Sequence, residues 1–129
     1  MDASGMVISA GGLMVTALVV YFVTKHAAEG TLDVNGGVGI KTRLTRSSQQ
    51  AWEIGHRAAL PWVRRCALLC LGTGVLALVS FLVAEGPLLG QTVPVFVLIV
   101  GYGGLVVLLA RGTVAANRAV RSSGDERGR

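Results

Sequence analysis

The chain has 129 residues, of which 52% are apolar, and its 12 Lys and Arg residues give a formal net charge of +5. From this length and composition we expect one small helical membrane domain and no separate soluble domain. Three long apolar runs contain no Asp, Glu, Lys, Arg or His. The sequence therefore argues against a proton-coupled exporter, which needs a carboxylate within a span. It also argues against a membrane hydrolase or transferase, which needs clustered catalytic groups at one depth.

The apolar runs predict an all-α integral membrane protein with three spans, at residues 7–24, 66–84 and 93–110. The runs contain 18, 19 and 18 residues. At about 1.5 Å per residue, each helix would be about 27 Å long, close to the roughly 30 Å hydrocarbon core of a bilayer. We therefore assign residues 1–110 to a membrane domain and expect the polar tail, residues 111–129, to be disordered.

Basic residues are confined to two of the four polar segments. The loop of residues 25–65 holds seven Lys and Arg residues and the tail holds five, whereas residues 1–6 and the loop of residues 85–92 hold none. Cytoplasmic flanks of membrane spans attract Lys and Arg. This split predicts a multi-pass protein of the bacterial cytoplasmic (inner) membrane, with the N-terminus outside and the C-terminus in the cytoplasm. The second loop, which contains Pro87, is expected to form a tight helical hairpin.

The inner loop contains the pattern of a further helix. Ser47 and Gln50 have the spacing of an N-terminal capping box, and Glu53 and Arg57 have the spacing of a favourable i,i+4 ion pair. These signals predict a helix over residues 48–59 of the loop.

One face of that helix carries Trp52, His56 and Ala59. An amphipathic helix with an aromatic anchor can lie in the plane of the membrane interface. We therefore expect an amphipathic interfacial helix in the cytoplasmic loop, with Trp52 and His56 at the interface and Pro61 separating it from the second span. Considered alone, the pattern also fits a plain surface helix whose charges face water.

Glycines and one tyrosine predict contacts between the spans. Gly101 and Gly104 lie three residues apart on one face of the third span. Small residues allow helices to approach closely in lipid. We expect ordinary packing here, because Leu105 occupies the place of the second glycine of a GxxxG motif. Tyr102 lies in mid-span and needs a hydrogen-bond partner, which Ser80 or a backbone carbonyl would supply.

The middle of the inner loop reads N-G-G-V-G-I-K-T-R-L-T, followed by S-x-x-x-W and, after three further residues, H-R. This run resembles the inner-loop signature of the SdpI family of bacterial membrane proteins. The family pattern is Asn, a short spacer, Gly-Ile/Tyr-Arg/Lys-Thr, a Ser/Thr-rich link, and Trp followed by His or Asn next to Arg. The resemblance extends over residues 5–110, and the matching positions are Asn35, Gly39, Ile40, Lys41, Thr42, Ser48, Trp52, His56 and Arg57.

The resemblance implies a non-enzymatic protein that acts in toxin immunity or membrane signalling through its basic loop. The namesake of the family protects a cell that makes a membrane-active killing peptide and holds a cytoplasmic repressor at the membrane. It is longer, with extra spans, so this chain resembles its C-terminal half. The implied partners are a peptide toxin or a repressor. The candidate partner- or lipid-binding residues are Asn35, Gly39, Lys41, Thr42, Arg43, Trp52, His56 and Arg57.

Other functions remain open or are disfavoured by the residues. The main alternative is an accessory subunit that packs against a larger membrane complex. A metal site at His56, Cys66 and Cys70 lacks a fourth ligand, and the glycines of the loop lack the ending of a phosphate-binding loop, so we expect no metal and no cofactor. The basic residues suit topology and anionic headgroups. We therefore expect the lipid bilayer as a partner and no nucleic acid.

Overall fold

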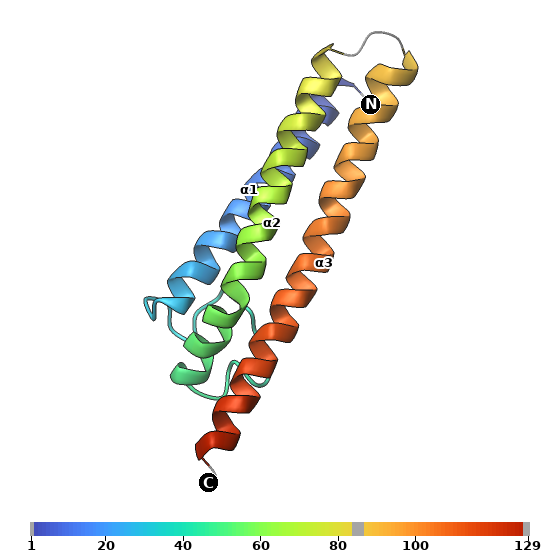
Figure 1. Cartoon of the computed structure of the whole chain (residues 1–129). Helices are drawn as coiled ribbons and strands as arrows, with labels where there is room; N and C mark the ends of the chain where they lie inside the picture. The colour runs from blue at the N-terminus through green and yellow to red at the C-terminus, as the bar shows by residue number, and fades with distance from the viewer. Residues whose placement is uncertain (1, 84–86, 128–129) are drawn as a thin grey trace.

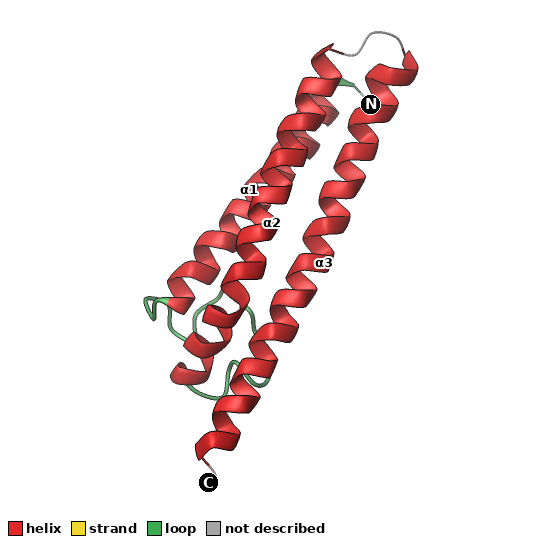
Figure 2. Cartoon of the chain, in the orientation of Figure 1, coloured by secondary structure: helices red, strands yellow, loops and turns green. Residues whose placement is uncertain are grey.

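The computed structural model describes residues 2–83 and 87–127 of the chain. It consists of three helices: α1 (Ala3–Ala28), α2 (Gln49–Val83) and α3 (Pro87–Arg127). The helices lie side by side, and the two ends of the chain lie at opposite ends of the bundle (Figure 1). The described residues contain no strand (Figure 2), so the predicted all-α class is confirmed.

All three helices are long and apolar enough to cross a membrane, with mean hydropathies of 2.2, 2.5 and 2.5 in their most apolar windows. This fits a multi-pass membrane protein. The helices have 26, 35 and 41 residues. At about 1.5 Å per residue, α2 is about 52 Å long and α3 about 61 Å, well beyond the roughly 30 Å of hydrocarbon. The apolar run lies at the C-terminal end of α2 and in the N-terminal half of α3, so the first turns of α2 and the last turns of α3 extend together beyond the apolar part of the bundle.

Helix α2 is the central element of the bundle. It packs against both α1 and α3, whereas α1 and α3 touch each other at few positions. Small residues let the helices approach closely. A Cβ atom added at Gly101 would lie 2.5 Å from Thr73 Oγ1, and one at Gly104 would collide with Leu69. The predicted packing role of this glycine pair is confirmed, and both contacts are with α2. The buried core consists of Met6, Ala10, Leu13, Ala17, Cys66, Cys70, Ala77 and Leu98.

A hydrogen bond joins α1 and α3 in the middle of the bundle. The hydroxyl of Tyr102 donates to the backbone carbonyl of Ser9 at 2.9 Å. Gly12, one turn further along α1, leaves space beside this hydroxyl, because a Cβ there would lie 3.8 Å from the tyrosine oxygen. Of the two partners considered for Tyr102, the backbone carbonyl is therefore the one used.

The expected interfacial helix is not a separate element. Residues 49–59 are the first turns of α2, which continues through Pro61 without a break. Tertiary contacts hold these turns in line with the span: Cβ atoms added at Gly55 and Gly112 would lie 3.6 Å from Ala116 and 3.8 Å from Ala59. Proline removes one backbone hydrogen bond, and packing against α3 outweighs that loss here.

The cap of α2 also differs from the prediction by one residue. The hydroxyl of Ser48, not that of Ser47, accepts the hydrogen bond from the Ala51 N–H, at 3.0 Å. Ser47 instead donates to the carbonyl of Leu44 at 2.7 Å and closes the preceding turn. The one-residue shift is within the usual uncertainty of a helix boundary drawn from sequence.

The expected disordered tail is also incorrect over its described part, because α3 continues to Arg127. Ala116 and Val120 are buried, and both lie close to Gly55 of α2. This packing provides the tertiary stabilisation that a polar helix end needs. At the other end, Pro87 opens α3, a position that suits proline. The predicted hairpin involves residues 84–86, which lie outside the described residues.

Candidate functional site

The loop of residues 29–48, between α1 and α2, folds back against the start of α2. Asp33 forms a local turn in which its carboxylate accepts a hydrogen bond from the Asn35 N–H at 2.7 Å. The side chain of Gln49, the first residue of α2, then holds this turn. Its Oε1 accepts from the Val34 N–H at 3.0 Å, and its Nε2 donates to the Leu32 carbonyl at 3.2 Å. The first half of the loop is thus fastened to α2.

Gly39 lies flat against the indole of Trp52. Its φ angle is +119°, a conformation that favours glycine. A Cβ atom here would lie 2.6 Å from Trp52 Cη2 and 3.0 Å from His56 Nε2. Trp52 is fully buried, and its ring lies 4.1 Å from that of His56, centroid to centroid. No side chain other than that of glycine fits between the loop and these two rings.

His56 links the loop to α2 through both ring nitrogens. The Ile40 N–H donates to Nε2 at 2.9 Å, so Nδ1 carries the proton and donates to the Trp52 carbonyl at 2.8 Å. The residue lies ten positions before the apolar run of α2, outside the hydrocarbon. Burial lowers the pKa of His56 below its ordinary value, and the hydrogen bond to Trp52 opposes this shift in part. The imidazole is therefore a neutral acceptor. It is buried against the loop, whereas the sequence predicted a position at the membrane interface.

The second half of the loop is fastened by threonines. Thr45 is fully buried, and its hydroxyl donates to the Ile40 carbonyl at 2.7 Å. The same hydroxyl accepts from the Thr42 N–H at 3.0 Å. Thr42 in turn donates its own hydroxyl to Asn117 Oδ1 of α3 at 2.6 Å. The methyl group of Thr45 lies over Gly55, where a Cβ atom would be 2.7 Å away. These contacts join the loop to α2 and α3 at once.

Arg57 caps the end of α1. Its Nε donates to the carbonyl of Ala28 at 2.9 Å, which satisfies one of the carbonyls left free at a helix C-terminus. The predicted ion pair with Glu53 is absent. Glu53 instead packs against Gly30, whose φ angle is +78° and whose added Cβ would lie 2.9 Å from a carboxylate oxygen.

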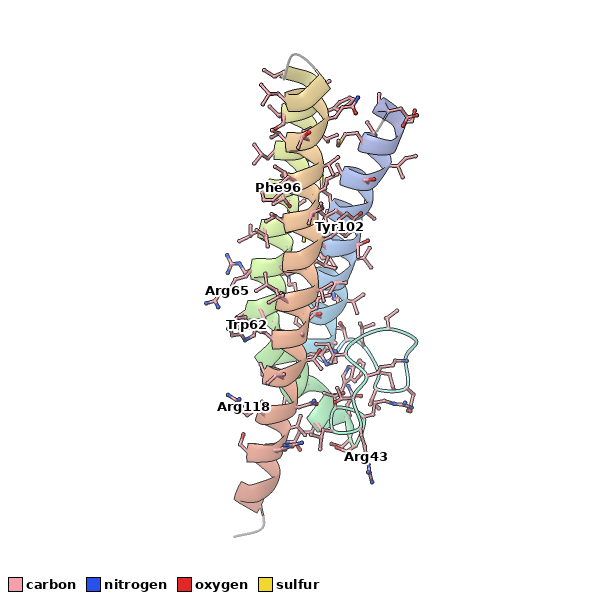
Figure 3. The ribbon with its side chains drawn as sticks, turned by 90° about the vertical axis from the view of Figure 1, so that its right-hand side faces the viewer. Arg43, Trp62, Arg65, Phe96, Tyr102 and Arg118 are labelled. Carbon is pink, nitrogen blue, oxygen red and sulfur yellow. The ribbon has the colours of Figure 1, made fainter. Side chains whose placement is uncertain are left out.

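Three basic side chains remain exposed on the outer side of the loop. Lys41, Arg43 and Arg46 line a shallow hollow of about 410 Å³, together with Thr42. Arg43 points away from the helices (Figure 3). Among the described side chains, the only ion pairs are those of Glu29 with Lys25 and His26, so the hollow carries unpaired positive charge. We call Lys41, Arg43 and Arg46 the basic face.

The opposite side of the same loop segment borders a cavity of about 580 Å³ between α1 and α3. Residues 37–42 form one wall of this cavity, at the end of the apolar part of the bundle. The other walls are mostly aliphatic and come from all three helices: Val19, Val20, Val23, Thr24, Val63, Leu109 and Thr113. One short segment thus separates an apolar cavity from a basic surface.

The structure divides the eight residues singled out from the sequence into three groups. Gly39 and the buried rings of Trp52 and His56 form a clamp. Thr42 holds the loop to α3, and Arg57 joins α2 to the end of α1. The remaining residues, Asn35, Lys41 and Arg43, are exposed. The eight positions therefore do not form one contiguous binding site.

Sequence reasoning missed four residues of this region: Thr45, Arg46, Gly55 and Asn117. Asn117 was missed because it lies in the segment expected to be disordered. The spacing of Gly112, Ala116 and Val120, four residues apart on one helix face, was the signal that α3 continues to pack there.

The described residues contain no group of three or more His, Cys, Asp and Glu side chains that could hold a metal ion. The buried groups of the region are instead used in hydrogen bonds within the chain. One polar atom is an exception: Trp52 Nε1 is buried and has no hydrogen-bond partner.

A model of the SdpI/YfhL protein family matches residues 31–111. The match includes the clamp, the basic face, all of the described part of α2 and the apolar part of α3. No curated protein and no solved structure matches the chain. Because the family model covers well over half of the sequence, this chain belongs to the SdpI/YfhL protein family.

Proposed function

We propose that this chain is a non-enzymatic membrane protein that acts in toxin immunity or membrane signalling through its basic loop, which lies in the cytoplasm. The observation that carries the proposal is the rigid mounting of the basic face. Ile40 and Thr42, on either side of Lys41, are both held by side chains of other elements. The positions of the exposed charges therefore follow from the fold of the whole bundle.

A loop whose only role is to keep its charges in water does not need to be held in one conformation. Ordering a backbone residue costs about 1–2 kcal/mol of conformational entropy, so a loop whose charges only face water gains nothing from being fixed. A binding surface does gain, because a preordered surface loses less entropy when its partner arrives. The unpaired positive charge indicates a partner with an acidic surface. A cytoplasmic repressor, as the family resemblance implies, is a partner of this kind.

The apolar cavity on the other side of the loop supports a signalling role. A membrane-embedded peptide that entered the space between α1 and α3 would touch residues 37–42. The same residues carry Lys41 and adjoin Arg43 on the outer side. A toxin bound in the membrane would therefore move or stiffen the surface that the cytoplasmic partner contacts. This arrangement couples the two implied partners through one short segment.

The test uses the double variant Arg43→Gln, Arg46→Gln in cells that lack the native protein. Arg121→Gln, an exposed change on α3, is the control. The cells are challenged with medium from a culture of the toxin-producing strain, and proteins that co-purify from the membrane are identified. We expect the double variant to lose protection, or its cytoplasmic partner, at normal membrane abundance. Unchanged survival together with an unchanged set of co-purifying proteins would overturn the proposal.

A second candidate is an accessory subunit of a larger membrane complex. Its support is the outward position of Gly72 on α2 and Gly103 on α3, where an added Cβ would meet no atom within 4 Å. Small residues on a lipid-facing surface allow another helix to approach. Release of a large complex by Gly103→Leu, with no effect of the basic-face variant, would favour this second function.

A further inference from the structure

A second basic surface lies on the side of the bundle away from the loop. The indole of Trp62 on α2 is flanked by two guanidinium groups. Arg65 Cζ lies 5.0 Å from the ring centroid, and Arg111 Cζ, from α3, lies 5.6 Å from it. Both distances are within the range of cation–π attraction. Arg65, Trp62 and Arg118 follow one another from top to bottom along the edge of the bundle opposite Arg43 (Figure 3).

A groove of about 670 Å³ runs along this edge. We call it the Arg–Trp groove; Trp62, Arg111 and Arg118 line it together with small and aliphatic residues of α3, and Arg65 adjoins it at the Trp62 ring. Arg111 and Arg118 lie seven residues apart on α3, which places them on one face at a separation of about 10.5 Å. Gly112 keeps the two helices close here, because a Cβ on it would lie 3.6 Å from Trp62 Cβ. The groove is therefore part of the helix packing and needs no rearrangement to form.

The end of the Arg–Trp groove at Trp62 and Arg111 borders the apolar runs, which places this end at the depth of the lipid headgroups. Arg65 directly precedes the apolar run of α2, and Arg111 directly follows that of α3. The antiparallel helices thus bring their first charged residues beyond the hydrocarbon to the same level. One turn closer to the middle of the membrane, the side chains of Leu68 and Val107 are 64% and 56% exposed. They offer an apolar surface directly above the two arginines.

The charges of the groove call for an anion. Among the described side chains, no carboxylate lies within ion-pair distance of Arg65, Arg111 or Arg118. Two guanidinium groups within about 6 Å of one indole ring repel each other, and an anion bound by both relieves this repulsion. A phosphate suits this position, because guanidinium groups bind phosphate oxygens through pairs of parallel hydrogen bonds.

We propose that the Arg–Trp groove binds an anionic glycerophospholipid from the surrounding bilayer. Its phosphate is bound by Arg65 and Arg111, its acyl chains lie along Leu68 and Val107, and its headgroup extends towards Arg118. A zwitterionic lipid is disfavoured, because the ammonium group beyond its phosphate would meet the charge of Arg118. This inference stands apart from the proposed function, since it involves neither the basic face nor the clamp.

The first experiment is native mass spectrometry of the full chain, titrated with phosphatidylglycerol or phosphatidylcholine. The variants are Arg65→Gln, Arg111→Gln in the groove and Arg43→Gln, Arg46→Gln in the basic face, which remove the same charge. Because the groove variant loses charge-assisted hydrogen bonds to the phosphate, we expect its phosphatidylglycerol affinity to fall about tenfold or more. The basic-face variant should change by less than about twofold, as expected for a screened distant charge. Equal losses in both variants, no loss in the groove variant, or equal binding of both lipids to the native chain would overturn the proposal.

The second experiment compares two lipids on the native chain and keeps both arginines, so it does not depend on the folding of the double variant. The native chain is placed in vesicles of phosphatidylcholine that contain a small fraction of phosphatidylglycerol brominated near the headgroup, and tryptophan fluorescence is measured. Brominated phosphatidylglycerol should quench more than the same fraction of brominated phosphatidylcholine. The extra quenching should disappear in Trp62→Phe, which retains the buried Trp52. Equal quenching by both lipids, or extra quenching that persists in Trp62→Phe, would contradict the assignment.

Discussion

The backbone N–H of Ile40 donates to Nε2 of His56 at 2.9 Å, which fixes the loop to α2 at the residue just before Lys41. The same contact holds Gly39 against Trp52 on its other side. A single neutral imidazole therefore determines where the basic face begins. This arrangement makes the shape of the loop sensitive to changes in that ring, and it can be tested without knowing the partner.

Acid should loosen the loop. The pKa of His56 is lowered in the folded chain relative to the unfolded value of about 6.5. The unfolded state therefore binds more protons as the pH falls, so the clamp is fully stable above about pH 6.5 and loses stability below it. Hydrogen-exchange protection factors of residues 36–46 should fall between pH 7.5 and pH 5.0. The drop should vanish in His56→Gln and persist in His26→Gln, which changes an exposed histidine. A drop that survives in His56→Gln would assign the effect to another group.

Gly39→Ala should destabilise the loop far more than Gly37→Ala. The added methyl group would collide with Trp52 and force an unfavourable φ angle, at a cost of about 1–3 kcal/mol. At Gly37 the Cβ meets no atom within 4 Å, so the matched change should cost nothing or stabilise slightly. Limited proteolysis of the purified protein, with the cleavage site located in residues 29–48, measures the difference. Equal resistance of the two variants would show that the loop is not held as described.

The link between Thr42 and Asn117 should behave as one coupled pair. Thr42→Val and Asn117→Ala each remove the hydrogen bond at 2.6 Å, so the double variant should cost less than the sum of the single ones. We expect a coupling free energy of about 0.5–3 kcal/mol, which is typical of side chains in direct contact. Thermal unfolding in detergent, followed by circular dichroism, gives the four values of the cycle. Strict additivity would mean that the two side chains do not interact.

The three apolar helices and the face of α2 that carries Trp52 could be predicted from the sequence, because both depend on local patterns. Three charge-free runs long enough to cross a bilayer are sufficient to predict three apolar helices. The spacing of Trp52, His56 and Ala59 places them on one face, and all three are buried there. What that face contacts is not a local property. The pattern suits a helix face that lies on a membrane surface. In the structure, this face packs against the loop of residues 29–48 instead.

The remainder of the candidate site depends on contacts across long sequence separations. Asn117 is 75 residues from Thr42, and neither residue indicates the other as its partner. Pro61 is a local signal for a break, and packing of Gly55 and Gly112 overrides it. The continuation of α3 through Arg127 likewise depends on Ala116 and Val120, which bury themselves against α2. Composition alone could not reveal this, since the segment is polar.

The orientation of the bundle can be tested by cysteine labelling in a chain whose Cys66 and Cys70 are replaced by Ala. Lys and Arg favour the cytoplasmic side, so the loop of residues 29–48 should be inside the cell. A cysteine at Gln91, near the start of α3, should react with an impermeant maleimide added to intact cells. A cysteine at Ser48 should react only after the membrane is permeabilised. The opposite pattern would invert the topology and remove the basic face from the cytoplasm.

Two neighbouring glycines of α3 should separate folding from partner binding. A side chain at Gly104 would collide with Leu69 of α2, so Gly104→Leu should destabilise the bundle by about 1–3 kcal/mol or more, as overpacking does. Gly103 faces outward with open space around it, so Gly103→Leu should leave the unfolding temperature nearly unchanged. Thermal unfolding in mild detergent compares the two variants, and size-exclusion chromatography shows whether either leaves a larger complex. A loss of stability in Gly103→Leu equal to that in Gly104→Leu would contradict the packing of α3 against α2. A complex that Gly103→Leu releases from an otherwise intact chain would identify the outer surface of α3 as the place where a partner helix binds.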